Sequence, residues 1–451
     1  MTTGVAGRNA RLAAVGAKSG AAYAVHRARR AVATPEQRVA LDEEHQLRTA
    51  AQVAETLGPK KGALMKVGQM ASYLDEGMPE PVREALASLQ QDAPPMAPEL
   101  CAEVVRAELG ADPERVFAEW NPVPIAAASI GQVHRARTHE GDEVAVKVQY
   151  PGVDEAIRAD LASGDMLFRA LSMMFPGLEA GPLVEELRAR LVEELDYTIE
   201  AHNQRLFGRY YTGHPYIHIP RVFDSLSTSR VLTTEFADGA RFAEVEHWSQ
   251  AERDAAAETI YRFVFRSIYR LHAFNGDPHP GNYLFKPGGQ VTFLDFGLVK
   301  HYTREEVRIF EDLIRTLVLE DDIVAYRQVL ENANILLPEA PITDDEVQAY
   351  FGHFYEFVMK DEVVTFSDEY ASESVRKIFD LQRNHEVTRY SNVPPMLLIS
   401  QRINLGLHAV LARLHATANF RKIAEELWPM VDGPPTTPMG EAEHAWLATR
   451  A

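Results

Sequence analysis

The sequence is poor in several features that would each indicate a class of protein. Its 451 residues contain one cysteine, Cys101, which excludes an internal disulfide and any metal site built from several cysteines. No apolar run approaches the length of about 18 residues that a transmembrane helix needs. Basic residues are outnumbered 46 to 65 by acidic ones, and the net charge of −19 argues against nucleic acid as a partner. Because one cysteine gives no sign of an oxidising compartment, we expect a cytoplasmic protein.

Acidic residues are absent from residues 1–35, which carry a charge of +6 and leave −25 for the remainder. This arm is rich in alanine and glycine and lacks the long apolar core of a secretory signal. We expect it to be solvated or to pack on the body as a helix. The alternative is peripheral contact with an anionic membrane, which a basic helix can make.

The most informative stretch is residues 275–300, NGDPHPGNYLFKPGGQVTFLDFGLVK. Two β-prone runs, YLFK and VTFLD, flank a PGGQ segment that has the composition of a hairpin loop. If Lys286 pairs with Val291 across this loop, Asn282 lies opposite Asp295. The stretch is therefore predicted to be a hairpin that brings polar side chains together at its open end.

Three polar residues of this stretch have the spacing of a phosphoryl-transfer site. Asp277 and Asn282 fit the Asp-x-x-x-x-Asn pattern of a kinase catalytic loop, and Asp295 begins an Asp-Phe-Gly triplet, whose aspartate holds magnesium in kinases. Carboxylate and carboxamide oxygens are hard ligands that suit Mg²⁺. We expect Asn282 and Asp295 to hold the metal and Asp277 to orient or deprotonate the acceptor.

A strand pattern precedes this stretch, in the segment EVAVKVQY. Val144, Val146 and Val148 share one face of the predicted strand, and Lys147 projects from the other face beside Ala145. The sequence VAVK is typical of the kinase strand whose lysine anchors the phosphates of ATP. We assign that role to Lys147.

The segment AAASIGQV, before this strand, fits the kinase phosphate loop G-x-G-x-x-G-x-V with alanine at the first two glycines. Alanine resists the positive φ that glycine accepts, and its methyl group keeps the backbone further from phosphate. We expect a loop that still covers a nucleotide, with an altered grip. The residues assigned to this nucleotide site are Ala126, Ala127, Ala128, Ser129, Gly131 and Val133.

Several acidic residues lie in the helical segment EELDYTIEAHNQRLF. Helical spacing predicts that Glu193, Asp196 and Glu200 share one face, with Glu194 turned away. In a kinase, one glutamate of this helix pairs with the strand lysine. The spacing leaves three glutamates as candidates, and we assign Glu200 to Lys147.

The sequence after the Asp-Phe-Gly triplet lacks a feature of protein kinases. The segment TREE, from Thr303, is a capping box, so a helix begins about six residues beyond Gly297. No long segment for phosphorylation and no Ala-Pro-Glu motif follow, although protein kinases use these to dock a peptide. His279 stands where protein kinases commonly carry lysine. Together these features argue against a protein substrate.

Over roughly residues 50–300 these motifs resemble the UbiB family of atypical, protein-kinase-like kinases, also called the AarF family. The segment KVGQ, from Lys66 to Gln69, matches the family's K-x-G-Q motif, and ELD, from Glu194 to Asp196, matches its E-x-D motif. The resemblance implies that the K-x-G-Q helix covers the active site, so that Lys66 and Gln69 reach the nucleotide. We place Glu194 and Asp196 near Lys66 and the metal.

The resemblance also implies a function. Family members act as ATPases, are associated with quinone and other membrane-lipid metabolism, and often contact membranes. Their alanine-rich loop tunes nucleotide selectivity and restrains protein phosphorylation. Many bacterial members end in apolar membrane-spanning helices, which this sequence lacks.

The expected fold is a helix-rich, two-lobed, protein-kinase-like α+β fold with an N-terminal helical extension. Glu235, which lies just before an expected hinge between the lobes, is assigned to the nucleotide site. The expected parts are a basic arm (1–35), a helical extension with the K-x-G-Q motif (36–120), an N-lobe with inserted helices (121–236), a C-lobe with helical additions (237–431) and a loose, proline-rich tail (432–451).

The expected reaction moves the γ-phosphoryl group of Mg-ATP to water or to a small, lipid- or quinone-related acceptor, with Asp277, Lys147 and Lys66 as the catalytic residues. ADP is the alternative nucleotide. One alternative function is a nucleotide-gated scaffold with little turnover. Another is an antibiotic or sugar phosphotransferase, a class whose catalytic loops also run Asp-x-His-x-x-Asn but which lacks the K-x-G-Q and E-x-D motifs.

Overall fold

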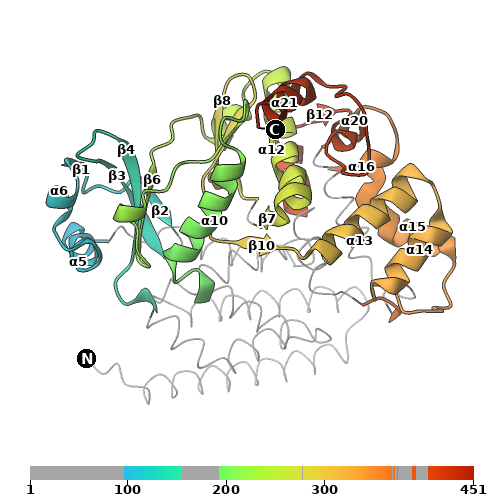
Figure 1. Cartoon of the computed structure of the whole chain (residues 1–451), viewed down its shortest axis with the longest axis horizontal. Helices are drawn as coiled ribbons and strands as arrows, with labels where there is room; N and C mark the ends of the chain where they lie inside the picture. The colour runs from blue at the N-terminus through green and yellow to red at the C-terminus, as the bar shows by residue number, and fades with distance from the viewer. Residues whose placement is uncertain are drawn as a thin grey trace, which may run out of the picture. The chain divides into compact units, whose positions relative to one another are not determined.

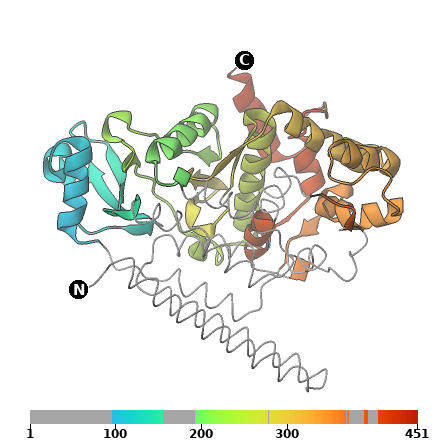
Figure 2. The same ribbon diagram turned by 90° about the horizontal axis from the view of Figure 1, so that it is seen from below.

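The computed structural model describes residues 96–128, 130–154, 192–276, 278–367, 369–370, 373, 387, 389–392 and 405–450. Lys66, Gln69, Ser129 and Asp277 lie outside these residues. The chain divides into two compact units: Met1–Val104, Pro122–His134 and Val148–Leu195 form one, and Val105–Asn121, Arg135–Lys147 and Asp196–Ala451 form the other. Figure 1 labels the helices and strands, and Figure 2 shows the same ribbon turned by 90°.

Helix α5 (Pro98–Leu109) is the first described element, and Gly110, with φ of 82°, follows its last residue. In the first unit, its Cys101 is buried, and the Cys101 Sγ atom lies 3.4 Å from Nε2 of His134. The same His134 nitrogen lies 2.9 Å from Nε2 of Gln132, whose Oε1 accepts a hydrogen bond from the Met96 amide. Burial raises the pKa of the Cys101 thiol to about 11. This cysteine is therefore a structural residue.

A five-stranded sheet contains the strand predicted for the segment EVAVKVQY. Its order is β1-β3-β4-β6, and β2 also pairs with β3. Val144, Val146 and Val148 are fully buried while Lys147 is half-buried, which confirms the two faces expected for this strand. The strands are β1 (Glu119–Trp120), β2 (Ala126–Ala128), β3 (Gly131–Arg137), β4 (Glu143–Gln149) and β6 (Val231–Glu235).

Helix α10 (Tyr197–Tyr210) carries the E-x-D region at its beginning. Asp196 is the N-cap residue: its backbone is extended and its side chain accepts a hydrogen bond from the Thr198 amide at 2.9 Å. Glu193 therefore precedes the helix. The prediction that Glu193 and Asp196 share a helical face with Glu200 is wrong, because a capping aspartate satisfies free amides at a helix start and so ends the pattern there.

Helix α12 (Gln250–Arg266) continues through a π-helical turn, η3 (Ser267–Leu271), into strand β7 (Ala273–Asn275). His272 ends this helical run with φ of 50°. Ile260, Phe263, Val264 and Ile268 of this run are buried, and Leu271 is half-buried. Strand β7 pairs antiparallel with β10 (Val299–His301), so the strand that leads to residue 277 adjoins the strand that follows the Asp-Phe-Gly triplet.

The predicted hairpin is present, with a different register. Strands β8 (Tyr283–Lys286) and β9 (Gln290–Phe293) pair antiparallel, and Lys286 pairs with Gln290, not with Val291. Both glycines of the PGGQ segment have positive φ, 83° and 80°, which accommodates a loop shorter by one residue. As a result the Leu294 amide donates to the Asn282 carbonyl at 3.0 Å, and Asp295 lies one position beyond this pair. Strand β5 (Ile217–His218) runs parallel to β9.

Helix α13 (Arg304–Ile314) begins at the predicted capping box, in which Thr303 and Glu306 bond to each other's backbone amides. None of the helices in the described ranges is long and apolar enough to span a bilayer. The remaining elements are α6 (Pro113–Val116), η2 (Asp224–Leu226), α11 (Phe242–Val245), η4 (Pro280–Asn282), η5 (Arg315–Leu319), α14 (Ile323–Asn332), α15 (Asp344–Phe351), η6 (Gly352–Tyr355), α16 (Glu356–Met359), β11 (Val364–Thr365), β12 (Thr417–Ala418), α20 (Phe420–Glu425) and α21 (Pro438–Ala448).

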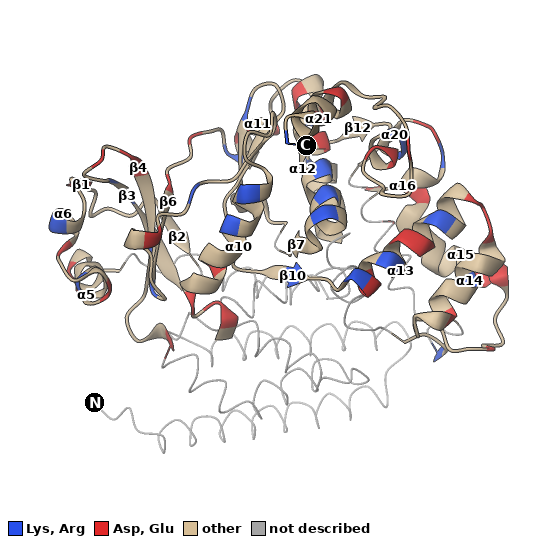
Figure 3. Ribbon diagram, viewed as in Figure 1, with Lys and Arg blue, Asp and Glu red and all other residues tan. Residues whose placement is uncertain are grey.

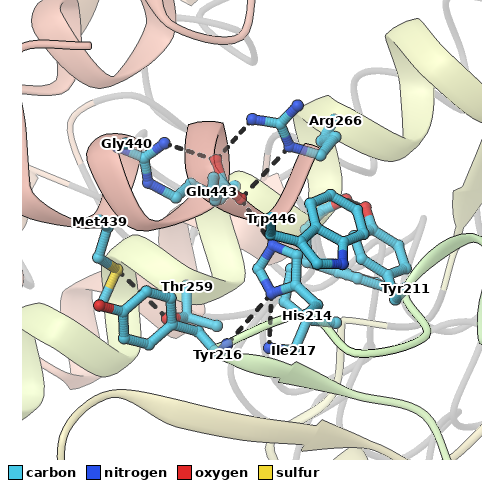
Figure 4. Close-up of polar contacts among 12 residues, drawn as sticks. Tyr211, His214, Tyr216, Ile217, Thr259, Arg266, Met439, Gly440, Glu443 and Trp446 are labelled. Carbon is cyan, nitrogen blue, oxygen red and sulfur yellow. Dashed lines mark hydrogen bonds and ion pairs between the residues drawn. The ribbon is translucent and has the colours of Figure 1, made fainter. Parts of the chain in front are cut away.

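The prediction of a loose tail over 432–451 is wrong, because helix α21 packs into the second unit. Figure 4 shows Glu443 of this helix in contact with Arg266 and His214. Glu443 is 1% exposed and also pairs with Arg262, at 2.8 Å, and the basic residues of α12 are visible in Figure 3. These partners lie far from α21 in the sequence, so the local proline-rich composition gave no sign of them.

Candidate functional site

Lys147 of β4 forms the centre of a charged cluster in the second unit. Its Nζ atom donates to both carboxylate oxygens of Glu200, at 2.8 and 3.0 Å, and the two side chains are 17% and 6% exposed. The Tyr197 ring lies 5.0 Å from the same nitrogen. The structure therefore contains the pair that the sequence analysis assigned, although the role of either residue toward a nucleotide stays a prediction.

Asp295 is the second carboxylate beside Lys147. Its Oδ2 atom lies 3.7 Å from Nζ, and its Oδ1 atom accepts a hydrogen bond from the Gly297 amide at 2.8 Å. Burial disfavours the charged lysine, but Asp295 and Glu200 outweigh burial and hold the pKa of Lys147 well above its usual range. The site therefore presents a permanent ammonium group between two carboxylates.

Gly297 allows these groups to lie close together. A Cβ atom at this position would lie 3.2 Å from Oδ1 of Asp295 and 3.6 Å from Oε2 of Glu200. The first of these separations is tighter than most Cβ contacts, so a side chain would displace the aspartate. The glycine of the triplet is thus explained by space around the carboxylates.

Asn282 is the last residue of the short helix η4 before β8, and His279 is the N-cap residue of that helix. Nδ1 of His279 accepts a hydrogen bond from the Gly281 amide at 3.0 Å, so this residue caps the turn. The backbone bond between Leu294 and Asn282 places Asn282 beside the residue before Asp295. The predicted base, Asp277, lies outside the described residues.

The alanine-rich segment belongs to the first unit and forms a hairpin. Ala126, Ala127 and Ala128 are strand β2, and Ala128 pairs with Gly131 at the start of β3. The segment expected to cover a nucleotide thus has three of its alanines in strand β2, which pairs antiparallel with β3. Their contact with a nucleotide stays a prediction.

The remaining assigned residues have structural contacts or lie beyond the described ranges. Glu235 is 3.1 Å from Nε2 of His218 and accepts from the Arg221 amide at 3.2 Å. The hydrogen bond with His218 lowers the pKa of Glu235. Asp196 caps α10, and the expected proximity of Glu194 and Asp196 to Lys66 concerns a residue outside the described part.

Two asparagines near the triplet were missed by the sequence analysis. Asn275, at the end of β7, donates to the Asp295 carbonyl at 2.6 Å. Asn203 of α10 donates to the Phe296 carbonyl at 3.1 Å. Helical spacing could have identified Asn203, because it lies one turn after Glu200 on the face that was already predicted to point toward Lys147.

The side chains of the cluster fit a hard cation bound together with an anion. Asp295 is a carboxylate whose side chain is 36% exposed, and Asn282 supplies a carboxamide oxygen, a donor set that suits Mg²⁺. The Lys147 ammonium suits a phosphate group. Asp295 and Asn282 are therefore described residues that could hold magnesium, and Lys147 is a described residue that could contact a phosphate group.

A separate cavity of about 610 Å³ lies in the second unit. Its volume is within the range of small-molecule sites. None of its lining residues belongs to the Lys147 cluster. These residues are Leu317, Val318, Asp321, Glu356, Phe357, Met359, Lys360, Glu362, Val364 and Tyr370.

Comparison with known proteins gives three consistent similarities. Residues 88–329 match the family model described as ABC1 atypical kinase-like domain. The chain is 28% identical over 372 residues to the mitochondrial atypical kinase COQ8 of Saccharomyces cerevisiae, and this match covers 82% of the chain and 74% of the yeast protein. It is 29% identical over 308 residues to AarF domain-containing kinase 1 of Drosophila melanogaster, which covers 67% of this chain and 59% of the fly protein.

A solved structure is also similar. It contains Rv3197 from Mycobacterium tuberculosis in complex with erythromycin, and it matches with 31% identity and a TM-score of 0.64. The match covers 87% of this chain and 99% of that chain.

Proposed function

Since the chain belongs to the ABC1 atypical kinase-like family, the UbiB family that its motifs resemble, we propose that it is an ATP-dependent phosphotransferase or ATPase. The observation that carries this proposal is the Lys147 cluster, in which Glu200 and Asp295 lie 2.8 and 3.7 Å from one ammonium group. Kinases use this combination to anchor phosphates and a metal.

The residues have distinct roles in the proposed reaction. Glu200 would hold Lys147 on the α- and β-phosphates, and Asp295 and Asn282 would hold Mg²⁺, which would neutralise phosphate charge when bound. Asp277 orients or deprotonates the attacking hydroxyl group. Phosphoryl transfer depends mainly on positioning and on charge stabilisation, and these groups supply both.

We infer a small acceptor or water, because little chain is available to bind a peptide after the triplet. Between Gly297 and Thr303 the chain forms strand β10 and then enters the capping box of α13. The name of the yeast relative describes that relative as a mitochondrial protein. A lipid- or quinone-related acceptor, and peripheral membrane contact through residues 1–35, are part of this proposal.

Nucleotide hydrolysis in the presence of lipid tests the proposal. Wild type and Asp277→Asn are assayed with Mg-ATP and with Mg-ADP, with and without vesicles of anionic phospholipid. We expect wild type to hydrolyse ATP faster than the variant does. A wild-type rate no higher than that of the variant, together with measurable nucleotide binding, contradicts the proposed enzymatic activity and favours a nucleotide-gated scaffold. Metabolite profiling of a deletion strain then identifies the acceptor.

A second candidate function is the binding or phosphorylation of an antibiotic, which is favoured by the similar structure solved with erythromycin. We assign the ligand to the 610 Å³ cavity, where Phe357 and Met359 offer apolar contacts and Asp321 and Glu362 suit a protonated amine. Incubation with erythromycin and Mg-ATP followed by mass spectrometry separates the outcomes. A phosphorylated product supports the phosphotransferase, unmodified bound drug supports a binding site, and no binding excludes both.

A further inference from the structure

We propose that Asn203 is a positioning residue that fastens helix α10 to the Asp295-Phe296-Gly297 turn. Through this contact it holds the Asp295 carboxylate in the place where magnesium is to bind. The contact of Asn203 with the turn belongs to the architecture of the second unit. The holding of the carboxylate for magnesium rests on the proposed function, because it gives Asp295 the role of a metal ligand.

Both ends of the Asn203 carboxamide are engaged. Its Nδ2 atom donates to the Phe296 carbonyl at 3.1 Å, and its Oδ1 atom accepts from Nε2 of His301 at 3.2 Å. The side chain is buried, with 4% of the residue exposed. A buried amide with both groups bonded has one orientation, so Asn203 fixes the backbone of the turn in a defined direction.

The same face of α10 makes two further contacts with the cluster. Glu200 lies one turn before Asn203 and bonds to Lys147, and Phe207 lies one turn after it, with its ring centre 5.0 Å from that of Phe296. Residues three and four positions apart face the same side of a helix. One helix face therefore contacts the anchoring lysine, the backbone of the turn and the buried side chain of the turn.

A second asparagine holds the turn from the opposite strand. Asn275 donates to the Asp295 carbonyl, and the next amide along the chain, that of Gly276, donates to the Leu298 carbonyl at 2.7 Å. Consecutive carbonyls of the turn, at 295 and 296, thus receive hydrogen bonds from two different elements, β7 and α10. Phe207 packing is non-directional, so the hydrogen bond of Asn203 is the contact of α10 that sets the orientation of this backbone.

Asn203→Asp removes the hydrogen bond to the Phe296 carbonyl and adds a negative charge, which the matched control variant also adds. Asn203→Asp keeps the shape and the oxygen that faces His301 but replaces the donor to the Phe296 carbonyl with an acceptor. We expect the Mg²⁺ concentration for half-maximal ATP hydrolysis to rise roughly tenfold, as loss of one buried hydrogen bond implies. Nucleotide affinity without magnesium stays within about twofold, because Lys147 and Glu200 remain paired.

The matched control is the next residue of the helix. Gln204 is 1% exposed, and its Nε2 atom donates to the Pro220 carbonyl at 2.6 Å, away from the turn. Gln204→Glu makes the same chemical change as Asn203→Asp. We expect a comparable loss of thermal stability with no change in the magnesium requirement. An equal shift in both variants, or no shift in Asn203→Asp, contradicts the positioning role.

Hydrogen–deuterium exchange tests the contact without relying on activity. We expect peptides that cover residues 294–302 to exchange faster in Asn203→Asp than in wild type or in Gln204→Glu. Unchanged exchange in Asn203→Asp, or equal acceleration in both variants, overturns the inference. If wild type shows no magnesium-dependent nucleotide binding, the proposed function fails, and the exchange result still decides the structural role of Asn203.

Discussion

Lys147 and Glu200 form a bidentate ion pair in a nearly buried setting, with nitrogen–oxygen distances of 2.8 and 3.0 Å. The two residues come from different elements, β4 and α10, and are separated by 53 positions in the chain. A buried charge that loses its partner is strongly destabilised. The pair therefore links the position of α10 to the chemistry of the lysine.

The first prediction concerns this pair. Lys147→Met removes the phosphate anchor and Glu200→Gln weakens its positioning, so we expect affinity for Mg-ATP to fall about 100-fold and about 10-fold, respectively. Titration calorimetry measures both. The control is Lys286→Met, which removes an exposed lysine from strand β8 and should leave the affinity unchanged. Equal affinities for Lys147→Met and the control contradict the assignment of Lys147.

The second prediction concerns the space beside Asp295. In Gly297→Ala the new Cβ atom lies 3.2 Å from the Asp295 carboxylate, so we expect a roughly tenfold loss of magnesium-dependent activity with a modest change in stability. Gly433 has no atom within 4 Å of a built Cβ, and Gly433→Ala is the matched control. Steady-state rates at varied Mg²⁺ measure this loss of activity, and unchanged rates in Gly297→Ala contradict the prediction.

The third prediction concerns helix α21. Glu443→Gln removes the charge that balances Arg262 and Arg266 in a buried network, and we expect about 3–5 kcal/mol less stability. Glu441→Gln, on the exposed side of the same helix, should change stability by less than about 0.5 kcal/mol. Denaturant unfolding followed by tryptophan fluorescence measures both. Equal losses in the two variants show that α21 depends on helix propensity and not on the network.

The fourth prediction concerns pH. Burial and, to a smaller extent, the nearby His353 together lower the pKa of His408 to about 4. Because the folded pKa is below the unfolded value of 6.5, the unfolded state binds more protons between these values, and stability falls as pH drops from about 6.5 to about 4. The loss amounts to ~3 kcal/mol.

His408→Phe tests this pH dependence, because phenylalanine suits the surrounding rings of Phe357 and Phe366 and does not titrate. We expect the difference in unfolding free energy between pH 7.5 and pH 5 to shrink in this variant. His444→Gln, at an exposed position, should retain the wild-type difference. A wild-type pH difference in His408→Phe contradicts the prediction.

Local patterns predicted part of the fold and of the site. Alternating hydrophobicity identified β4, β-prone runs around the PGGQ segment identified β8 and β9, and the capping box located the start of α13, because these features depend on neighbouring residues. The pairing of Lys147 with Glu200 was predicted because the roles of strand lysine and helix glutamate are linked in kinases. Membership of the UbiB family was predicted from motif order and is confirmed by the family match.

Contacts between distant residues were not predicted. The position of α21 depends on Arg262 and Arg266, and the roles of Asn203 and Asn275 depend on carbonyls about 20 to 93 positions away. The hairpin register was misjudged by one residue because two glycines with positive φ allow a shorter loop. In each case the information lies in tertiary geometry and not in local composition.

The buried thiol of Cys101 has a practical consequence for spectroscopy. With a pKa of about 11, roughly one thiol in 10⁴ is ionised at neutral pH, and the side chain is 1% exposed, so maleimide reagents should not react with the native protein. A cysteine introduced at an exposed position, such as Gly433→Cys, becomes the one reactive thiol of the 451-residue chain. Fluorescent or spin labels can therefore be attached at chosen places without first removing the native cysteine.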